Sequence, residues 1–124
     1  MKRKYLLFLI IILNLIILVG CNSTQQLDSE YLCDFSTTLG GEMINAHVRI
    51  FDKTDGNSEK IYSGYSHGGF TQKLKNGTYS VSADYSIQLS PNMYQTYGEH
   101  QEFVVDSNRV IIHLKLRKGG VVIF

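Results

Sequence analysis

The sequence predicts an all-β fold, a single antiparallel β-sandwich of about seven strands that follows an apolar N-terminal segment. Between residues 31 and 117, apolar and polar side chains alternate in short stretches, which is the period of a half-buried strand. Turn-forming residues separate these stretches at intervals of roughly ten residues, a spacing typical of β-sandwiches. No segment after Cys21 shows the spacing of an amphipathic helix.

Four strands are predicted in the first half of the domain, at residues 31–38, 46–51, 59–66 and 70–74. Within the first of them, Cys33 and Phe35 share one face with the neighbouring apolar positions, so we expect both side chains to point into the core. The turns between these strands are assigned to glycine-containing pairs, namely Gly40-Gly41, Asp55-Gly56 and Gly68-Gly69.

Three further strands are predicted at residues 78–85, 99–105 and 109–117. Lys75-Asn76-Gly77 is expected to form a tight hairpin into the first of these, because Asn-Gly suits the positive φ values of such turns. Residues 86–98 contain Pro91, the only proline of the chain, and are expected to be its longest irregular loop. Residues 119–124 are expected to be an apolar C-terminal tail that either adds a strand or docks on a partner.

The N-terminus has basic residues at positions 2–4 and then an apolar run at 5–19, interrupted only by an asparagine. This run is short for a membrane-spanning helix, which needs about 20 residues, and it fits a secretory signal peptide. Leu18-Val19-Gly20-Cys21 resembles the lipobox of bacterial lipoproteins. The resemblance implies that Cys21 receives a diacylglyceryl group and becomes the first residue after cleavage. The alternative is an uncleaved signal anchor in which Cys21 is an ordinary cysteine.

The predicted organisation is a lipoprotein signal peptide at 1–20, the lipidated cysteine and a polar tether at 21–29, the sandwich at 30–118 and the tail at 119–124. The chain has 12 Lys and Arg residues against 11 Asp and Glu. Without the three basic residues of the signal peptide, nine remain against eleven, a net charge of −2. This balance gives no indication of a nucleic-acid partner, which would require a clustered basic surface.

Cys33 has no partner for an intramolecular disulfide once Cys21 is lipidated, because the chain contains only 2 cysteines. A lone cysteine of this kind can be a reactive thiol or can pair with another chain. Since Cys33 is expected on the same strand face as Tyr31 and Phe35, we interpret it as a small core residue.

A second resemblance is carried by Ala46-His47-Val48-Arg49-Ile50, by Gly68-Gly69-Phe70 and by the segment from Leu74 to Ala83. In order and spacing these motifs are similar to the transthyretin-like, or carboxypeptidase-regulatory-like, β-sandwich module. The resemblance spans residues 31–117 and implies an immunoglobulin-like sandwich with a non-catalytic binding or spacer role. Ser66-His67 stands where that family usually has an aspartate, so no acidic role is implied for this turn.

No set of residues predicts catalysis, a metal site or a cofactor. The 4 histidines are scattered over different predicted elements, whereas a zinc site needs three or four converging ligands. The candidate ligand-binding residues are Met93, Tyr94 and Tyr97, because they lie in the expected long loop and binding residues concentrate on such loops. Their tyrosine rings could form a platform for a sugar or a protein, or could fill the edge of the core.

These observations predict an extracytoplasmic lipoprotein, anchored by the lipid on Cys21 to a bacterial cell membrane or outer membrane. Its sandwich is expected to be a non-catalytic protein-interaction or structural module whose partner is another envelope protein. Two alternatives stay open. One is a glycan-binding surface lipoprotein that uses Tyr94 and Tyr97, and the other is an exclusion-type lipoprotein encoded by a phage or plasmid.

Overall fold

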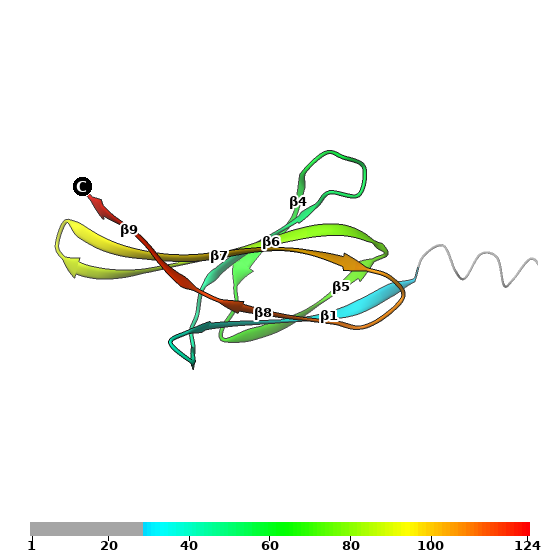
Figure 1. Cartoon of the computed structure of the whole chain (residues 1–124), viewed down its shortest axis with the longest axis horizontal. Helices are drawn as coiled ribbons and strands as arrows, with labels where there is room; N and C mark the ends of the chain where they lie inside the picture. Colours follow the sequence, from blue (N-terminus) through cyan, green and yellow to red (C-terminus); the bar gives the residue numbers. More distant parts are fainter. Residues whose placement is uncertain (1–28) are drawn as a thin grey trace, which may run out of the picture.

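The computed structural model describes residues 29–124, which form nine strands and no helix (Figure 1). The strands make two sheets that pack face to face, so the predicted all-β sandwich is confirmed. The expected signal peptide and the lipobox cysteine, Cys21, lie outside the described residues. Within residues 29–124, no helix is long and apolar enough to cross a membrane.

The first sheet is built around β1 (Glu30–Leu39). β5 (Gly69–Lys75) pairs with it antiparallel along one side, and the two-residue strand β2 (Glu42–Met43) pairs with its last residues. β8 (Val110–Lys115) pairs with β1 in the parallel direction. β1 and β8 therefore run the same way along the molecule.

The second sheet has five antiparallel strands in the order β4 (Glu59–Tyr65), β3 (His47–Asp52), β6 (Gly77–Ser90), β7 (Met93–Val105) and β9 (Arg117–Ile123). β8 and β9 are separated by a single residue, Leu116, at which the chain passes from the first sheet to the second. Leu116 is only 6% exposed, and its N–H donates to the carbonyl of Thr38 at 2.9 Å. A strand that switches sheets in this way closes one corner of a sandwich.

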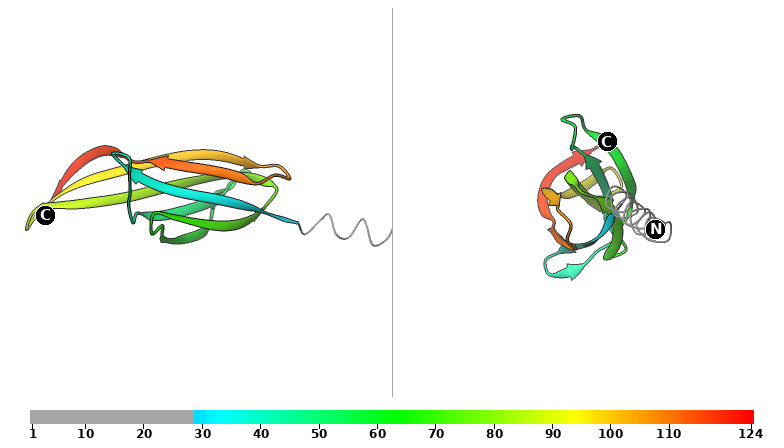
Figure 2. Two further views of the ribbon diagram at one scale, coloured as in Figure 1. Left: turned by 90° about the horizontal axis from the view of Figure 1, so that it is seen from below. Right: turned by 90° about the vertical axis from the view of Figure 1, so that its right-hand side faces the viewer.

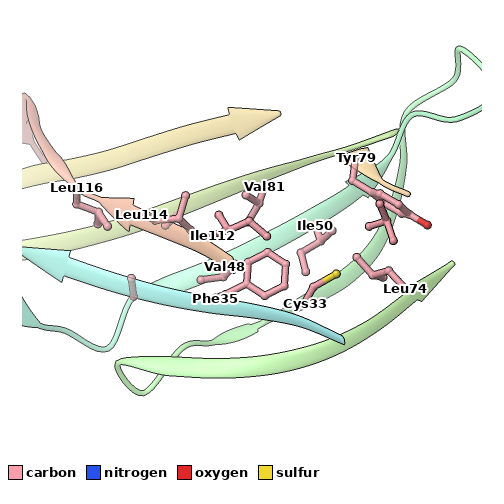
Figure 3. Close-up of a cluster of buried hydrophobic side chains, with 13 residues drawn as sticks. Cys33, Phe35, Val48, Ile50, Leu74, Tyr79, Val81, Ile112, Leu114 and Leu116 are labelled. Carbon is pink, nitrogen blue, oxygen red and sulfur yellow. The ribbon is translucent and has the colours of Figure 1, made fainter. Parts of the chain in front are cut away.

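The core lies between the two sheets, where alternate side chains of each strand point inward (Figure 3). Cys33 is fully buried there, which confirms it as a core residue. β3, β6 and β8 contribute the β-branched and leucine side chains that fill the space around it, among them Val48, Ile50, Val81, Ile112 and Leu114.

A chain of aromatic rings ties the two sheets together at one end of this core. Tyr62 stacks on Phe70 with ring centroids 5.0 Å apart, and Phe70 stacks on Phe35 at 4.9 Å. Phe35 meets Phe103 edge-on at 5.7 Å, and Phe103 stacks on Tyr79 at 5.5 Å. Such ring pairs add about 0.5–1.5 kcal/mol each beyond the area that they bury.

Residues 86–98 do not form the expected loop. β6 continues to Ser90 and β7 begins at Met93, so that only Pro91 and Asn92 make the turn between them. The alternation of apolar and polar residues in fact persists through Leu89, and the structure follows it. The expected tail is also a strand, because residues 119–123 belong to β9 and pair with β7.

The expected hairpin at Lys75-Asn76-Gly77 is wrong as well. β5 belongs to the first sheet and β6 to the second, so this turn connects the sheets and joins no paired strands. Asn76 instead holds the adjacent turn between β7 and β8. Its Oδ1 accepts from the N–H of Ser107 at 2.7 Å, and its Nδ2 donates to Ser107 Oγ at 3.1 Å. An Asn-Gly pair is compatible both with a hairpin between paired strands and with a turn that connects two sheets. Only the pairing of strands distant in the sequence shows which of the two turns is formed.

Candidate functional site

The most distinctive feature of the molecule is a three-stranded arm that projects beyond the sandwich (Figures 1 and 2). It consists of residues 85–97 at the far end of the β6–β7 hairpin and of residues 117–124, which carry β9. β3 pairs with β6 only as far as Asp84, and from Tyr85 onward β6 has β7 as its sole neighbour among the described strands. β9 lies along the other side of β7 and completes the arm.

A bulge in β9 fixes how this strand joins the arm. The register with β7 shifts between Gln95 and Tyr97, opposite Gly119 and Gly120. The side chain of Gln95 is buried and donates to the carbonyls of Gly119 and Gly120 at 3.0 and 3.3 Å, and Thr96 Oγ1 donates to the Gly120 carbonyl at 2.7 Å. These side-chain donors thus satisfy the carbonyl groups of Gly119 and Gly120, which have no backbone partner at the bulge.

The predicted binding residues Met93, Tyr94 and Tyr97 all lie on the arm, but they do not share a face. Tyr94 and Tyr97 are three residues apart in a regular part of β7, so their side chains point to opposite sides. Tyr97 is half-buried and packs with Tyr85 at the edge of the core, with ring centroids 6.3 Å apart. The two tyrosines therefore cannot form one stacking platform.

Tyr94 instead takes part in an open pocket on the outer face of the arm. Its ring meets that of Phe124 edge-on at 5.5 Å, and Val122 pairs with it across β7 and β9. The pocket has a volume of about 480 Å³ and is lined by Ser86, Pro91, Asn92, Tyr94, Thr96, Val122 and Phe124. Neither β9 nor Phe124 was among the candidate site residues of the sequence, because an uninterrupted apolar run carries no strand period.

The arm exposes apolar side chains on both faces, and beyond Arg117 and Lys118 at its base it has no charged side chain. Neither residues 85–97 nor residues 119–124 contain a lysine, arginine, aspartate or glutamate. Six of the twelve large hydrophobic residues that are exposed in the described chain lie on the arm, namely Ile87, Leu89, Val121, Val122, Ile123 and Phe124. An accumulation of exposed apolar side chains on one element is a common feature of association sites.

The arm and the start of the domain lie at opposite ends of the molecule (Figure 2). β1 begins at Glu30 beside Lys75, and it runs toward the end from which the arm projects. The turns after β5 and β7 gather at the same end as Glu30. A chain held by its N-terminal segment would therefore present the arm on its far side.

Three of the four histidines of the described chain hydrogen-bond to hydroxyl groups on neighbouring strands. His47 Nε2 lies 3.0 Å from Ser63 Oγ, His100 Nδ1 lies 2.9 Å from Ser82 Oγ, and His113 Nε2 lies 2.9 Å from Thr38 Oγ1. The first two pairs lie on the same face of the second sheet, and the third lies on the first sheet. Within residues 29–124, no group of three or more histidine, cysteine, aspartate or glutamate side chains is placed to hold a metal ion.

The sequence matches no protein-family model and no curated protein.

Proposed function

We propose that this protein is a lipid-anchored lipoprotein of a bacterial envelope, whose β-sandwich is a non-catalytic protein-interaction module. In this proposal Cys21 carries the lipid, the residues that follow it act as a tether, and the arm binds the partner. We also propose that the sandwich is related to the transthyretin-like module and that the partner is another envelope protein.

The observation that carries the proposal is the position of the arm. Half of the large hydrophobic residues that are exposed in the described chain gather on the arm, which has no charged side chain beyond Arg117 and Lys118 at its base and lies at the end opposite to Glu30. A lipid on Cys21 would hold the domain at its Glu30 end, so the arm would face away from that membrane surface. Tethering also raises the effective concentration of the arm for partners in the same envelope, so weak contacts suffice.

Cross-linking in intact bacteria tests the proposal. A tagged full-length chain is cross-linked, captured from detergent-solubilised membranes and identified with its partners by mass spectrometry, with Cys21→Ala as the unlipidated control. We expect a diacylglyceryl-modified Cys21 at the start of the captured chain and an envelope protein enriched only with the lipidated form. Equal enrichment with Cys21→Ala would contradict the role of the anchor, and the absence of any captured protein would contradict the role of the module.

A further inference from the structure

A second open pocket lies on the outer face of the second sheet, where the arm joins the sandwich (Figure 2). It has a volume of about 370 Å³ and is lined by Asn45, His47, Tyr65, Asp84, Tyr85 and Ser86. The strand pairing places His47, Tyr65 and Asp84 in one row across β3, β4 and β6. Ser86 follows on the same face of β6 and also lines the pocket beside Tyr94. The two pockets therefore adjoin, and together they form an outer groove that follows β6 onto the arm.

The outer groove has an aromatic ring in each of its two halves. Tyr65 is 59% exposed, and its ring centroid lies 5.4 Å from that of His47. In the other half lies Tyr94, which pairs with Gln88. Gln88 is four residue steps beyond Asp84, the residue in the row of Tyr65, which is about 13 Å along β6. The outer groove is therefore too long for a ligand with a single ring to contact both tyrosines.

Hydroxyl groups without a partner line the outer groove along its length. Those of Tyr65, Ser86 and Tyr94 make no hydrogen bond within residues 29–124. Asp84 is the one carboxylate among the described lining residues, and an ion pair with Arg49 balances its charge. Neither pocket is lined by a lysine or an arginine. The outer groove thus offers hydrogen bonds and aromatic surface to a ligand, but no excess of charge.

These properties do not fit three common classes of ligand. A phosphate group or a nucleotide would find no cationic side chain in the lining. A fatty-acyl chain requires an enclosed apolar cavity, whereas both pockets are open and carry free hydroxyl groups. A peptide that binds by strand addition uses the backbone of an edge strand. The outer groove instead crosses the faces of β3 and β7, which are paired on both sides, so side chains make its contacts.

We propose that the outer groove binds a neutral saccharide chain of more than one sugar unit. A sugar ring carries hydroxyl groups around its rim and C–H groups on its faces, so it stacks on an aromatic ring while polar side chains bond to its rim. Tyr65 and Tyr94 each stack on one sugar ring, and Ser86 and Asp84 bond to the hydroxyl groups between them. Tyr97 takes no part, because it lies on the opposite face of β7. This site goes beyond the proposed function, since its ligand is not a protein.

A glycan array probed with the full-length chain in detergent micelles tests the inference. The array carries neutral and charged oligosaccharides, and isothermal titration calorimetry with the free oligosaccharide gives the affinity for each glycan that is bound. We expect binding to neutral glycans of more than one sugar unit. Tyr65→Ala and Tyr94→Ala should each weaken this binding by about ten-fold, the loss of one well-packed aromatic contact, and Tyr94→Phe, which keeps the ring, should lose much less.

Ser86→Arg and Ile87→Arg form a matched pair on neighbouring positions of β6. Ser86 lies where the two pockets adjoin, whereas Ile87 is 38% exposed on the opposite face, together with Val121 and Ile123. Ser86→Arg places a bulky side chain across the outer groove and should abolish saccharide binding. Ile87→Arg should leave the saccharide affinity unchanged. Circular dichroism and the thermal midpoint show that both variants are folded.

Three results would overturn the inference: no neutral glycan bound on the array, binding confined to charged glycans, or an unchanged saccharide affinity in a folded Ser86→Arg variant. If no glycan is bound and Ser86→Arg instead loses the envelope protein captured by cross-linking, the outer groove holds a protein, so the saccharide site falls and the proposed function stands. Saccharide binding by a chain that captures no protein would support the site and contradict the proposed function.

Discussion

The hydroxyl oxygens of Thr37 and Ser66 lie 2.6 Å apart, and both side chains are completely buried. Thr37 belongs to β1 in the first sheet, and Ser66 follows β4 in the second, so this hydrogen bond links the two layers. The carbonyl oxygen of Ile44 lies 2.8 Å from Thr37 Oγ1 and 3.1 Å from Ser66 Oγ. One of the two hydroxyl groups donates to the other, and that second hydroxyl donates to this carbonyl. Ser66 Oγ also accepts from the N–H of Ala46 at 3.0 Å.

We expect Ser66→Ala to destabilise the domain by about 1–3 kcal/mol, because it leaves the buried N–H of Ala46 without an acceptor. The matched control is Ser82→Ala, which removes an exposed hydrogen bond to His100 and should change the free energy of unfolding by no more than about 0.5 kcal/mol. Urea unfolding of the two variants makes the comparison. Equal changes in the free energy of unfolding for the two variants would contradict a particular stabilising role of the buried hydrogen bonds of Ser66.

Asp34 predicts a dependence of stability on pH. Its carboxylate accepts from Thr71 Oγ1 at 2.7 Å and from Arg109 Nε at 2.6 Å, and these two hydrogen bonds, in that order, lower the pKa of Asp34. A lowered pKa in the folded state stabilises the fold above the ordinary pKa of aspartate, and this contribution is lost as the pH falls through the folded value.

Asp34→Asn should therefore lower the thermal midpoint at pH 7, and the difference from the unsubstituted chain should shrink as the pH drops below about 4. Asp55→Asn, in the exposed loop after β3, is the control and should leave the midpoint unchanged. A difference for Asp34→Asn that stays constant down to pH 2 would show that packing, and not the charge, causes the effect.

The thiol of Cys33 should be unreactive in the native domain. Burial first, and the nearby charge of Asp34 second, raise the pKa of Cys33, so at neutral pH the thiol stays protonated and is a poor nucleophile. We expect labelling by a maleimide only at the rate at which the domain unfolds, and rapid labelling in 8 M urea. Fast labelling of the native chain would contradict the burial of Cys33 and its role in the core.

The two glycines of the β9 bulge should respond differently to substitution. A Cβ at Gly119 would lie 2.9 Å from Thr96 Oγ1, which is held by its hydrogen bond to Gly120, whereas a Cβ at Gly120 would meet nothing within 4 Å. Gly119→Ala should cost about 1 kcal/mol or more, while Gly120→Ala should be tolerated. Amide hydrogen exchange at Phe124, whose N–H donates to Asn92, reports whether β9 has loosened.

The sandwich could be predicted from the sequence because its strands bury one face only. Tyr79, Val81 and Ala83 alternate with polar residues, and all three are buried in the core. The arm could not be predicted in the same way. Val121 to Phe124 are apolar at successive positions and are exposed on both faces of the described sheet, so the run has no period of two.

The sites were predictable only in part. Met93, Tyr94 and Tyr97 do lie on the arm, but their separation onto two faces follows from the strand pairing, which a single sequence does not reveal. Likewise, Asn76-Gly77 specifies a turn without specifying which strands the turn joins. Phe124 lies beside Tyr94 only because β9 pairs with β7, at a distance of many residues along the chain.

The most direct test of the account is photo-cross-linking from the arm in intact cells. A benzophenone side chain replaces Phe124 in one variant and, as the control, Val104, which is 60% exposed on β7 outside the arm. We predict adducts with another envelope protein from position 124, lost in the Cys21→Ala background, and none from position 104. Adducts from position 104 alone, or the same adducts from both positions, would contradict the assignment of the arm as the interaction surface.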